Sequence, residues 1–457
     1  MVTTLLVLTL LAQDPPSGDS QAASDDSYET QTPPPAYQAP GTTKFRGALE
    51  LSAYSMPSGT PGGAMDVFAL ALPILAVDSG DDFGFELGAE LRLRVFDEPP
   101  LQRDEDFRRV LRGRDWDETS DFGQVLRRLR VGSEASPVYV RAGRMELKTV
   151  GFGHLVSRYN NQLNPDYHPA SAFAVAAIGP TRTELFASDI LAGRIFAGEV
   201  SLDIGRTVSQ DNVFWDRYHF ALSAAHDFAQ VGGSSPAITL VHVDADAIIY
   251  RAEHVRVSGY AGGGTRLFGL EPEVGAVAGF AANGDVNNQM VTLGGRLEGR
   301  KQRGGFRHGM FGPAYELSRF SGVGFGLDPV ARESLPDSFS GFGEFEVGYG
   351  PASAMPDGPL RLFASLAAEY FIWGRLDGDA SITARFPGNK GGASVRFTML
   401  DALGRAPRFQ GTGEVRYRFT PVFYVVASGG TVFFPQPGGT LVRGAFGSIG
   451  LGMDMER

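Results

Sequence analysis

The stretch FGFELGAELRLRV, residues Phe83–Val95, decides the fold. Its odd positions are apolar or small, and its even positions are glycine or charged, as at Glu90, Arg92 and Arg94. Successive side chains of a β-strand point to opposite faces of the sheet. This unbroken phase therefore predicts one long strand with an apolar face and a charged face.

The same alternation recurs along the rest of the chain. Clear copies lie at Phe196–Ile204, Val291–Arg300 and Gly413–Phe419. Weaker copies lie at Phe45–Tyr54, Leu129–Leu147, Tyr218–Phe228, Ile238–Tyr250, Val255–Arg266, Phe339–Tyr349, Leu360–Trp373, Ile382–Phe386 and Leu441–Leu451. Clusters of Gly, Asp, Asn and Pro separate them, which is typical of hairpin turns. Segments of this kind over residues 43–457 predict about 16 strands, within a range of about 14 to 18.

Two architectures hold such strands. In a secreted soluble β-sandwich the apolar faces pack inward, and strands are usually about five or six residues long. In an outer-membrane barrel the apolar faces meet lipid and the charged faces meet an aqueous lumen. The strand length and the several charges per strand favour an all-β, transmembrane antiparallel barrel. Aromatic residues near strand ends, such as Phe45, Tyr54 and Phe96, suit the girdles at the membrane interfaces.

The composition excludes several classes of protein. The net charge of −11 argues against a general nucleic-acid binder. The absence of cysteine excludes disulfides, cysteine-ligated metal clusters and a thiol nucleophile. The longest apolar run, Val67–Val77, contains Pro73 and falls short of the roughly 18 to 20 residues that a spanning helix needs.

The N-terminal region indicates export. Residues 1–12 end in the apolar run Val2–Ala12 and are expected to be a signal peptide, although no basic residue precedes the run. Residues 13–42 are rich in Pro, Ser and acidic residues, and we expect a disordered linker there. The expected location is the outer membrane of a Gram-negative cell.

One segment resembles a known family. Gln124–Leu155 contains Arg141-Ala142-Gly143-Arg144, followed by Gly151-Phe152-Gly153, and over these roughly 30 residues it is similar to alginate-export-type porins. That resemblance implies a passive outer-membrane channel for charged or polyhydroxylated solutes. The C-terminus differs from that of such barrels, which usually end in an aromatic residue. Here the aromatic residue nearest to the C-terminus is Phe446. Either the last strand is Leu441–Leu451 with a short tail, or assembly differs.

The charged faces supply candidate pore-lining residues. They are Glu86, Glu90, Arg92, Arg94, Arg128, Arg130, Arg141, Arg296, Glu298, Glu414, Arg416 and Arg418. In a pore they would make a field that selects solutes, with arginines holding carboxylates or sugar hydroxyls. The alternative is that these Arg and Glu side chains brace a filled, non-conducting lumen.

The segment Thr149–Ala172 is too polar and too rich in proline to be a strand. We expect it to fold into the barrel as a constriction, with His154, Arg158, Asn161 and His168 near the path. The alternative is an outward loop held by local Asn and Asp turns.

Two further groups of polar residues are candidates for chemistry. His242, Asp244 and Asp246 share one face of their strand, where solvated lumen residues are favoured over a metal site. His219 and Ser223 share a strand phase, but no Gly-x-Ser-x-Gly or His-Glu-x-x-His motif occurs, so no catalysis and no cofactor are expected.

The segment Glu98–Asp121 carries dense charge of both signs. It is predicted to be a solvated surface loop with a short helix at Asp104–Leu111.

The sequence thus favours a passive channel. The rivals are a non-conducting barrel that anchors an envelope machine for motility, secretion or adhesion, and a barrel enzyme. The expected partners are outer-membrane lipid, lipopolysaccharide, the barrel assembly machinery and, for an anchor, proteins of an envelope complex. Nucleic acid is not among them.

Overall fold

The structure is a computed structural model that describes residues 43–57, 65–80, 83–96, 110–133, 136–163, 167–208, 217–228, 237–268, 273–286, 290–304, 306–316, 337–350, 360–404, 407–435 and 441–456. The expected signal peptide and linker lie outside these residues, as does most of the expected helix at Asp104–Leu111.

Most described residues belong to β-strands. These are β1 (Lys44–Pro57), β2 (Met65–Asp78), β3 (Phe83–Gly88), β4 (Leu91–Phe96), β5 (Leu126–Val131), β6 (Val138–Gly143), β7 (Ser171–Ile178), β8 (Thr181–Ala187), β9 (Ile195–Asp203), β10 (Tyr218–Asp227), β11 (Ile238–Ala252), β12 (Val255–Leu267), β13 (Val274–Val286), β14 (Val291–Arg303), β15 (Ser338–Tyr349), β16 (Arg361–Phe371), β17 (Leu376–Arg385), β18 (Gly391–Leu400), β19 (Arg408–Arg418), β20 (Phe423–Pro435) and β21 (Leu441–Glu456). The short helices are η2 (Gly113–Asp115), η3 (Thr119–Val125), α2 (Ile204–Val208) and η5 (Pro387–Asn389).

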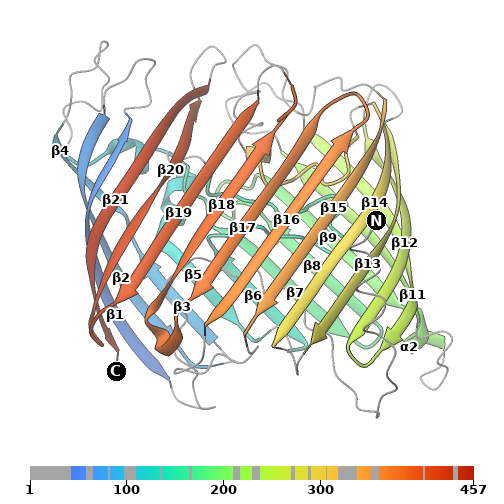
Figure 1. Ribbon diagram of the computed structural model, residues 1–457, viewed down its shortest axis with the longest axis horizontal. Coiled ribbons are helices and arrows are strands. Elements are labelled where there is room, and N and C mark those ends of the chain that lie inside the picture. Colours follow the sequence, from blue (N-terminus) through green and yellow to red (C-terminus); the bar gives the residue numbers. More distant parts are fainter. Residues whose placement is uncertain are drawn as a thin grey trace.

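The strands form one closed antiparallel barrel. Consecutive strands pair along the chain, and β21 pairs with β1 to close the sheet (Figure 1). The prediction of an all-β antiparallel barrel is confirmed. The last strand runs to Glu456, which pairs with Arg46, so the expected end at Leu451 with a short tail is wrong.

The wall has 20 strands, so the prediction of about 16 is wrong. There are 21 labelled strands, but β3 and β4 both pair with β2 and form one strand interrupted at residues 89–90. β5 pairs with β3 but not with β4. Residues 110–112 form the backbone hydrogen bonds with β4 instead. The prediction missed strands such as β2, β7 and β13, because their inward positions carry apolar or small residues that blur the alternation.

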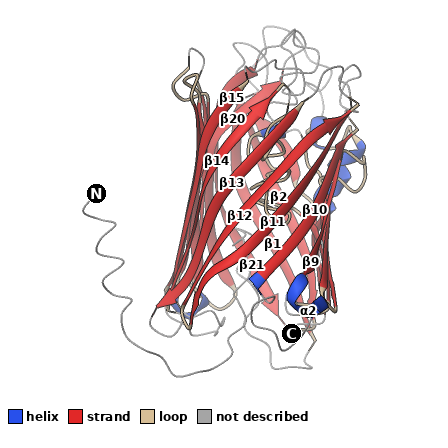
Figure 2. Cartoon of the chain, turned by 90° about the vertical axis from the view of Figure 1, so that its right-hand side faces the viewer, coloured by secondary structure: helices blue, strands red, loops and turns tan. Residues whose placement is uncertain are grey.

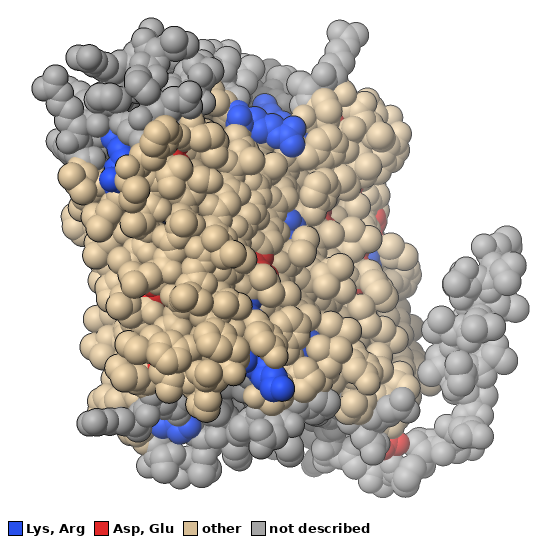
Figure 3. All heavy atoms as spheres, turned by 60° about the vertical axis from the view of Figure 1, so that its left-hand side comes forward, with Lys and Arg blue, Asp and Glu red and all other residues tan. Residues whose placement is uncertain are grey.

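The predicted phase of the strands is confirmed. Along β3 and β4, Glu86 and Arg92 are buried inside the barrel, while Leu93 is exposed outside. At the middle of β14, Leu297 is 70% exposed on the outer wall, whereas Glu298 is buried. On the side that Figure 3 shows, the outer wall is almost free of charged side chains over its middle, and Lys and Arg lie near its two ends. A closed barrel with an apolar exterior and a charged interior is a transmembrane barrel of the outer-membrane type.

The described residues contain no helix that is long and apolar enough to cross a membrane.

Tyr54 departs from the expected aromatic girdle. It points inward, is 7% exposed and packs with Phe68 and Phe434, and the guanidinium of Arg92 lies 4.9 Å from its ring centre. Phe45 and Phe96 do lie on the outer wall, as expected of interfacial residues. The inner face of β1, β2 and β20 is therefore partly apolar near this position.

The two ends of the barrel differ. The first residues of β1 and the last of β21 are paired, so both lie at one end, the terminus end (Figure 2). Because strands alternate in direction, the long connections 97–125, 144–170 and 304–337 all leave from the opposite end, the loop end. Outer-membrane barrels carry their long loops on the outside of the cell and their short turns in the periplasm.

Candidate functional site

The connection between β6 and β7, which we call inner loop 1, folds into the lumen over its described residues 144–163 and 167–170. Val156 and Tyr159 are fully buried, and Arg158 is 3% exposed, although none of them belongs to a strand. The loop returns to where it left, because Gly143 pairs with Ser171. Its polar backbone is satisfied partly by the wall, as when Gly151 and Phe152 donate their N–H groups to inward glutamates of β8 and β9.

Arg158 reaches the far side of the barrel. Its Nε donates to both carboxylate oxygens of Asp379 on β17, at 3.1 and 2.9 Å. Its Nη1 donates to Glu344 of β15 at 3.1 Å, and its Nη2 donates to Ser365 of β16 at 2.9 Å. The strands that launch the loop and the strands that receive Arg158 lie roughly half the wall apart. Inner loop 1 therefore spans the lumen.

His154 lies between two carboxylates of the wall. Its Nδ1 is 2.7 Å from Asp244 of β11, and its Nε2 is 3.4 Å from Glu298 of β14. Burial acts to lower the pKa of the His154 imidazole, but the bonds to these two carboxylates outweigh burial and raise that pKa above its usual value. Asp244 also contacts His242, whose Nδ1 lies 2.8 Å from its other oxygen. The expectation of solvated lumen residues here is wrong, because inner loop 1 covers both His242 and Asp244.

A second segment, residues 306–316, also folds into the lumen, and we call it inner loop 2. Its Phe311 forms a parallel bridge with Val156 of inner loop 1, and its Glu316 accepts a hydrogen bond from the Tyr159 hydroxyl. Its Tyr315 donates to Asp227 at the end of β10. The two inner loops thus hold each other as well as the wall.

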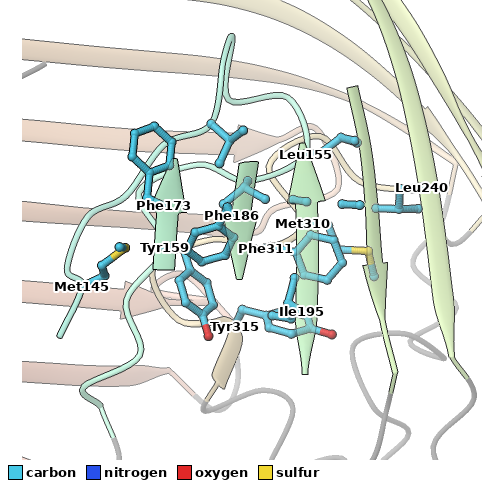
Figure 4. Close-up of a cluster of buried hydrophobic side chains, with 14 of the residues drawn as sticks. Met145, Leu155, Tyr159, Phe173, Phe186, Ile195, Leu240, Met310, Phe311 and Tyr315 are labelled. Carbon is cyan, nitrogen blue, oxygen red and sulfur yellow. The ribbon is translucent and has the colours of Figure 1, made fainter. Parts of the chain in front are cut away.

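An apolar cluster fills the space between the inner loops and β7 to β11. Figure 4 shows the rings of Tyr159, Phe311 and Tyr315 facing one another beside the wall strands. The cluster also includes Met145, Leu155, Phe173, Phe186, Ile195, Leu240 and Met310. Burial of this much apolar side chain stabilises the loops in place, because each large side chain contributes roughly 1.5–3 kcal/mol.

Inward glycines make room for the rings of inner loop 2. Gly264 and Gly275 are paired across β12 and β13. A Cβ atom at Gly275 would lie 2.5 Å from the Phe306 ring, and one at Gly264 would lie 2.7 Å from the same ring. Any larger residue at either position would therefore push Phe306 off the wall.

The connection 97–125 also enters the barrel in its described part. Asp115 and Asp121 are fully buried, and Arg92 donates to Asp115 at 2.8 Å. The prediction of a solvated surface loop over Glu98–Asp121 is therefore wrong for the buried residues Arg112, Asp115, Ser120 and Asp121. Burial raises the pKa of Asp121 to about 7, helped by repulsion from Glu118 and Asp117 and opposed by the backbone N–H of Glu118.

The predicted pore-lining residues all lie on the inward face, where most pair with a neighbour of opposite charge. Glu86 pairs with Arg127, Arg92 with Glu90, Arg94 with Asp66, Arg128 and Arg130 with Asp78, Arg296 with Glu298, Arg416 with Glu50 and Glu414, and Arg418 with Asp454. Arg141 lies opposite Arg130 across the β5–β6 pair.

The structure separates the four residues predicted for the constriction. His154 contacts β11 and β14, and Arg158 reaches β15, β16 and β17 on the far side. Asn161 instead holds the base of the loop, donating to the Ser171 hydroxyl at 2.6 Å, and His168 lies beside Asp115. The wall groups that receive Arg158 were missed, among them Asp379 and Glu344. The signal that could have found Glu344 is its place in the alternating pattern of Phe339–Tyr349.

A cavity of about 140 Å³, lined by both apolar and charged residues, remains between the inner loops and strands β14 to β18. Its lining includes the guanidinium groups of Arg158 and Arg300 and the carboxylates of Glu369 and Asp379. Phe342 supplies an aromatic surface against which the Arg300 guanidinium packs, 4.0 Å from the ring centre. The arrangement offers both signs of charge to a solute of a few heavy atoms.

Comparisons with known proteins return similar folds at low similarity. OpdK of Pseudomonas aeruginosa, solved with vanillate, is 12% identical over 91% of this chain and 99% of that one, with a TM-score of 0.35. A BenF-like porin of Pseudomonas fluorescens is 8% identical over 90% and 99%, with a TM-score of 0.34. OccAB4 of Acinetobacter baumannii is 8% identical over 91% and 98%, also with a TM-score of 0.34. No known family profile and no curated protein matches the chain.

Proposed function

We propose that this barrel is a porin-like outer-membrane channel of narrow bore for small charged or polyhydroxylated solutes. The observation that carries the proposal is the cavity beside Arg158, where a lumen crossed by two loops keeps a space whose lining includes guanidinium and carboxylate groups. Groups of this kind hold anions and sugar hydroxyls through charge-assisted and bidentate hydrogen bonds. The paired charges along the rest of the wall predict a modest ion preference.

A non-conducting anchor for an envelope machine is the second candidate. The apolar cluster between the inner loops favours it, because a lumen packed like a protein core resists opening. In both cases we expect the outer wall to contact lipid and lipopolysaccharide after insertion by the assembly machinery.

Conductance in planar bilayers separates the two candidates. A channel gives small, discrete current steps, and vesicles that contain it swell in small sugars and carboxylates but not in large ones. An anchor gives no steps and no swelling. If the purified, folded barrel gives no current steps, the channel proposal is wrong and the anchor remains.

A further inference from the structure

Three buried histidines from three separate segments meet on the inner wall. They are His154 of inner loop 1, His242 of β11 and His308 of inner loop 2, and none is more than 3% exposed. Their ring centres lie 4.8, 5.2 and 5.8 Å apart. Asp244 lies between the first two, and one ligand atom from each of His154, His242 and Asp244 falls within 4.8 Å of the others.

The hydrogen bonds of this group are incomplete. Among the described residues, neither ring nitrogen of His308 has a hydrogen-bond partner, and the Nε2 atom of His242 has none either. A buried polar atom without a partner costs roughly 1–3 kcal/mol, so such atoms in a native fold indicate a bound water molecule or ion. Asp244 cannot satisfy them, because its two oxygens are taken by His154 and His242.

The arrangement matches the coordination of a borderline divalent metal ion. Zinc binds histidine nitrogen at about 2.0–2.1 Å in tetrahedral sites, so that imidazoles on one ion have ring centres about 5 Å apart. Carboxylate and imidazole together suit zinc better than calcium or magnesium. Glu298 lies 3.4 Å from Nε2 of His154, where a carboxylate orients a metal-bound imidazole through its other nitrogen.

We propose that His154, His242, Asp244 and His308 bind one zinc-like divalent ion. One ring nitrogen of each histidine and one oxygen of Asp244 would supply the four ligands, since the ligand atoms of His154, His242 and Asp244 already lie within 4.8 Å of one another and His308 lies beside them. Each ligating nitrogen loses its proton to solvent, the other nitrogen of each ring keeps one, and His154 directs its remaining N–H at Glu298.

Such an ion would join both inner loops to the wall. His154 and His308 come from the two loops, and His242 and Asp244 come from β11, so one ion cross-links three segments that are far apart in sequence. An ion that binds only when both inner loops lie against β11 stabilises that arrangement by mass action. The proposal stands whether or not the lumen conducts.

Equilibrium dialysis of the chelator-stripped, folded barrel against Zn²⁺ tests the site. We expect one tightly bound zinc per chain in the parent and none in the His154→Asn/His242→Asn double variant, in which asparagine keeps a donor for Asp244. The matched control is His219→Asn, because His219 of β10 also points inward but bonds Asp246, and it should retain the zinc. Folding is checked by the heat-sensitive gel mobility of closed barrels.

The single variant His308→Asn guards against misfolding, since its ring has no hydrogen bond to lose within the described structure. We expect it to weaken zinc binding by about tenfold or more and to lower the absorbance of bound Co²⁺, which reports the number of ligands. Absence of stoichiometric zinc in the parent, or equal affinity in the parent and the double variant, would overturn the proposal.

Discussion

Arg158 of inner loop 1 donates hydrogen bonds to both carboxylate oxygens of Asp379, a residue of β17 that lies 221 positions later in the sequence. Both side chains are almost fully buried. This contact holds inner loop 1 against the side of the barrel opposite β6 and β7. We therefore expect it to keep the loop across the lumen. A buried pair of this kind contributes little when replaced as a unit but costs much when one partner is removed.

Removing one partner of this pair should loosen inner loop 1. Arg158→Gln leaves the Asp379 carboxylate buried without its principal cation, at a cost of about 3–5 kcal/mol. The double variant Arg158→Gln/Asp379→Asn should regain much of that loss, because the uncompensated charge is gone. Urea unfolding in lipid vesicles and limited proteolysis of inner loop 1 measure the stability of the single and the double variant. Additive losses in the double variant would show that the two residues do not act together.

A charge on the outer wall should destabilise the barrel strongly. Leu297 lies at the middle of β14 and faces outward, so Leu297→Arg should cost about 2–4 kcal/mol in a bilayer. Leu297→Ala is the matched control, because it removes apolar area without adding charge. Equal unfolding midpoints for the two variants in vesicles would mean that this face does not meet lipid.

The arginines near the terminus end should set part of the ion preference. Arg128 and Arg130 both lie 3.4 Å from Asp78, and replacing the two arginines by Gln leaves that carboxylate uncompensated. The reversal potential in a salt gradient should then shift toward cations. Arg303→Gln, an exposed residue at the end of β14, is the control and should leave it unchanged. A shift of equal size in the control would show that Arg128 and Arg130 do not set the ion preference.

The buried carboxyl of Asp121 should make the connection 97–125 sensitive to pH. Its pKa is raised to about 7 in the fold, against about 4 in an unfolded chain. Between these values the unfolded form loses its proton first, so the folded loop loses stability as pH rises from about 4 to about 7 and then levels off. Proteolysis of the loop should therefore be slower at pH 5 than at pH 7.5.

The variant Asp121→Asn checks that assignment. The amide keeps an acceptor for the Glu118 N–H but cannot ionise. Proteolysis of this variant should change little between the two pH values, and a pH effect as large as that of the parent would rule out Asp121 as its source.

The alternating strands were predictable because their environment is uniform along their length. Val291–Arg300 meets lipid on one side and polar groups on the other, so the two faces differ at every step. In β2 the inward residues Phe68, Leu72 and Ile74 pack within the barrel, so both faces are apolar and the alternation disappears. Strands of this kind escape the alternation pattern, which is why the predicted number of about 16 strands is lower than the 20 of the wall.

The filling of the lumen could be predicted only in part. The polar, proline-rich composition of Thr149–Ala172 indicated a segment that enters the barrel, but its partners are set by the closure of the wall. Nothing in the local sequence around Arg158 points to Asp379. The inward glycines of β12 and β13, including Gly264 and Gly275, are a sequence signal for this filling, because they mark where rings from a loop lie against the wall.

The most direct test of the central claim is the single-channel conductance of a barrel that lacks inner loop 1. Gly143 and Ser171 are paired, so a short turn can replace residues 145–169 without straining β6 or β7. We expect small current steps in the parent and steps several times larger in the shortened barrel, provided that both show the gel mobility of a closed barrel. Silence in both, or steps of equal size, would contradict a channel that is narrowed by this loop.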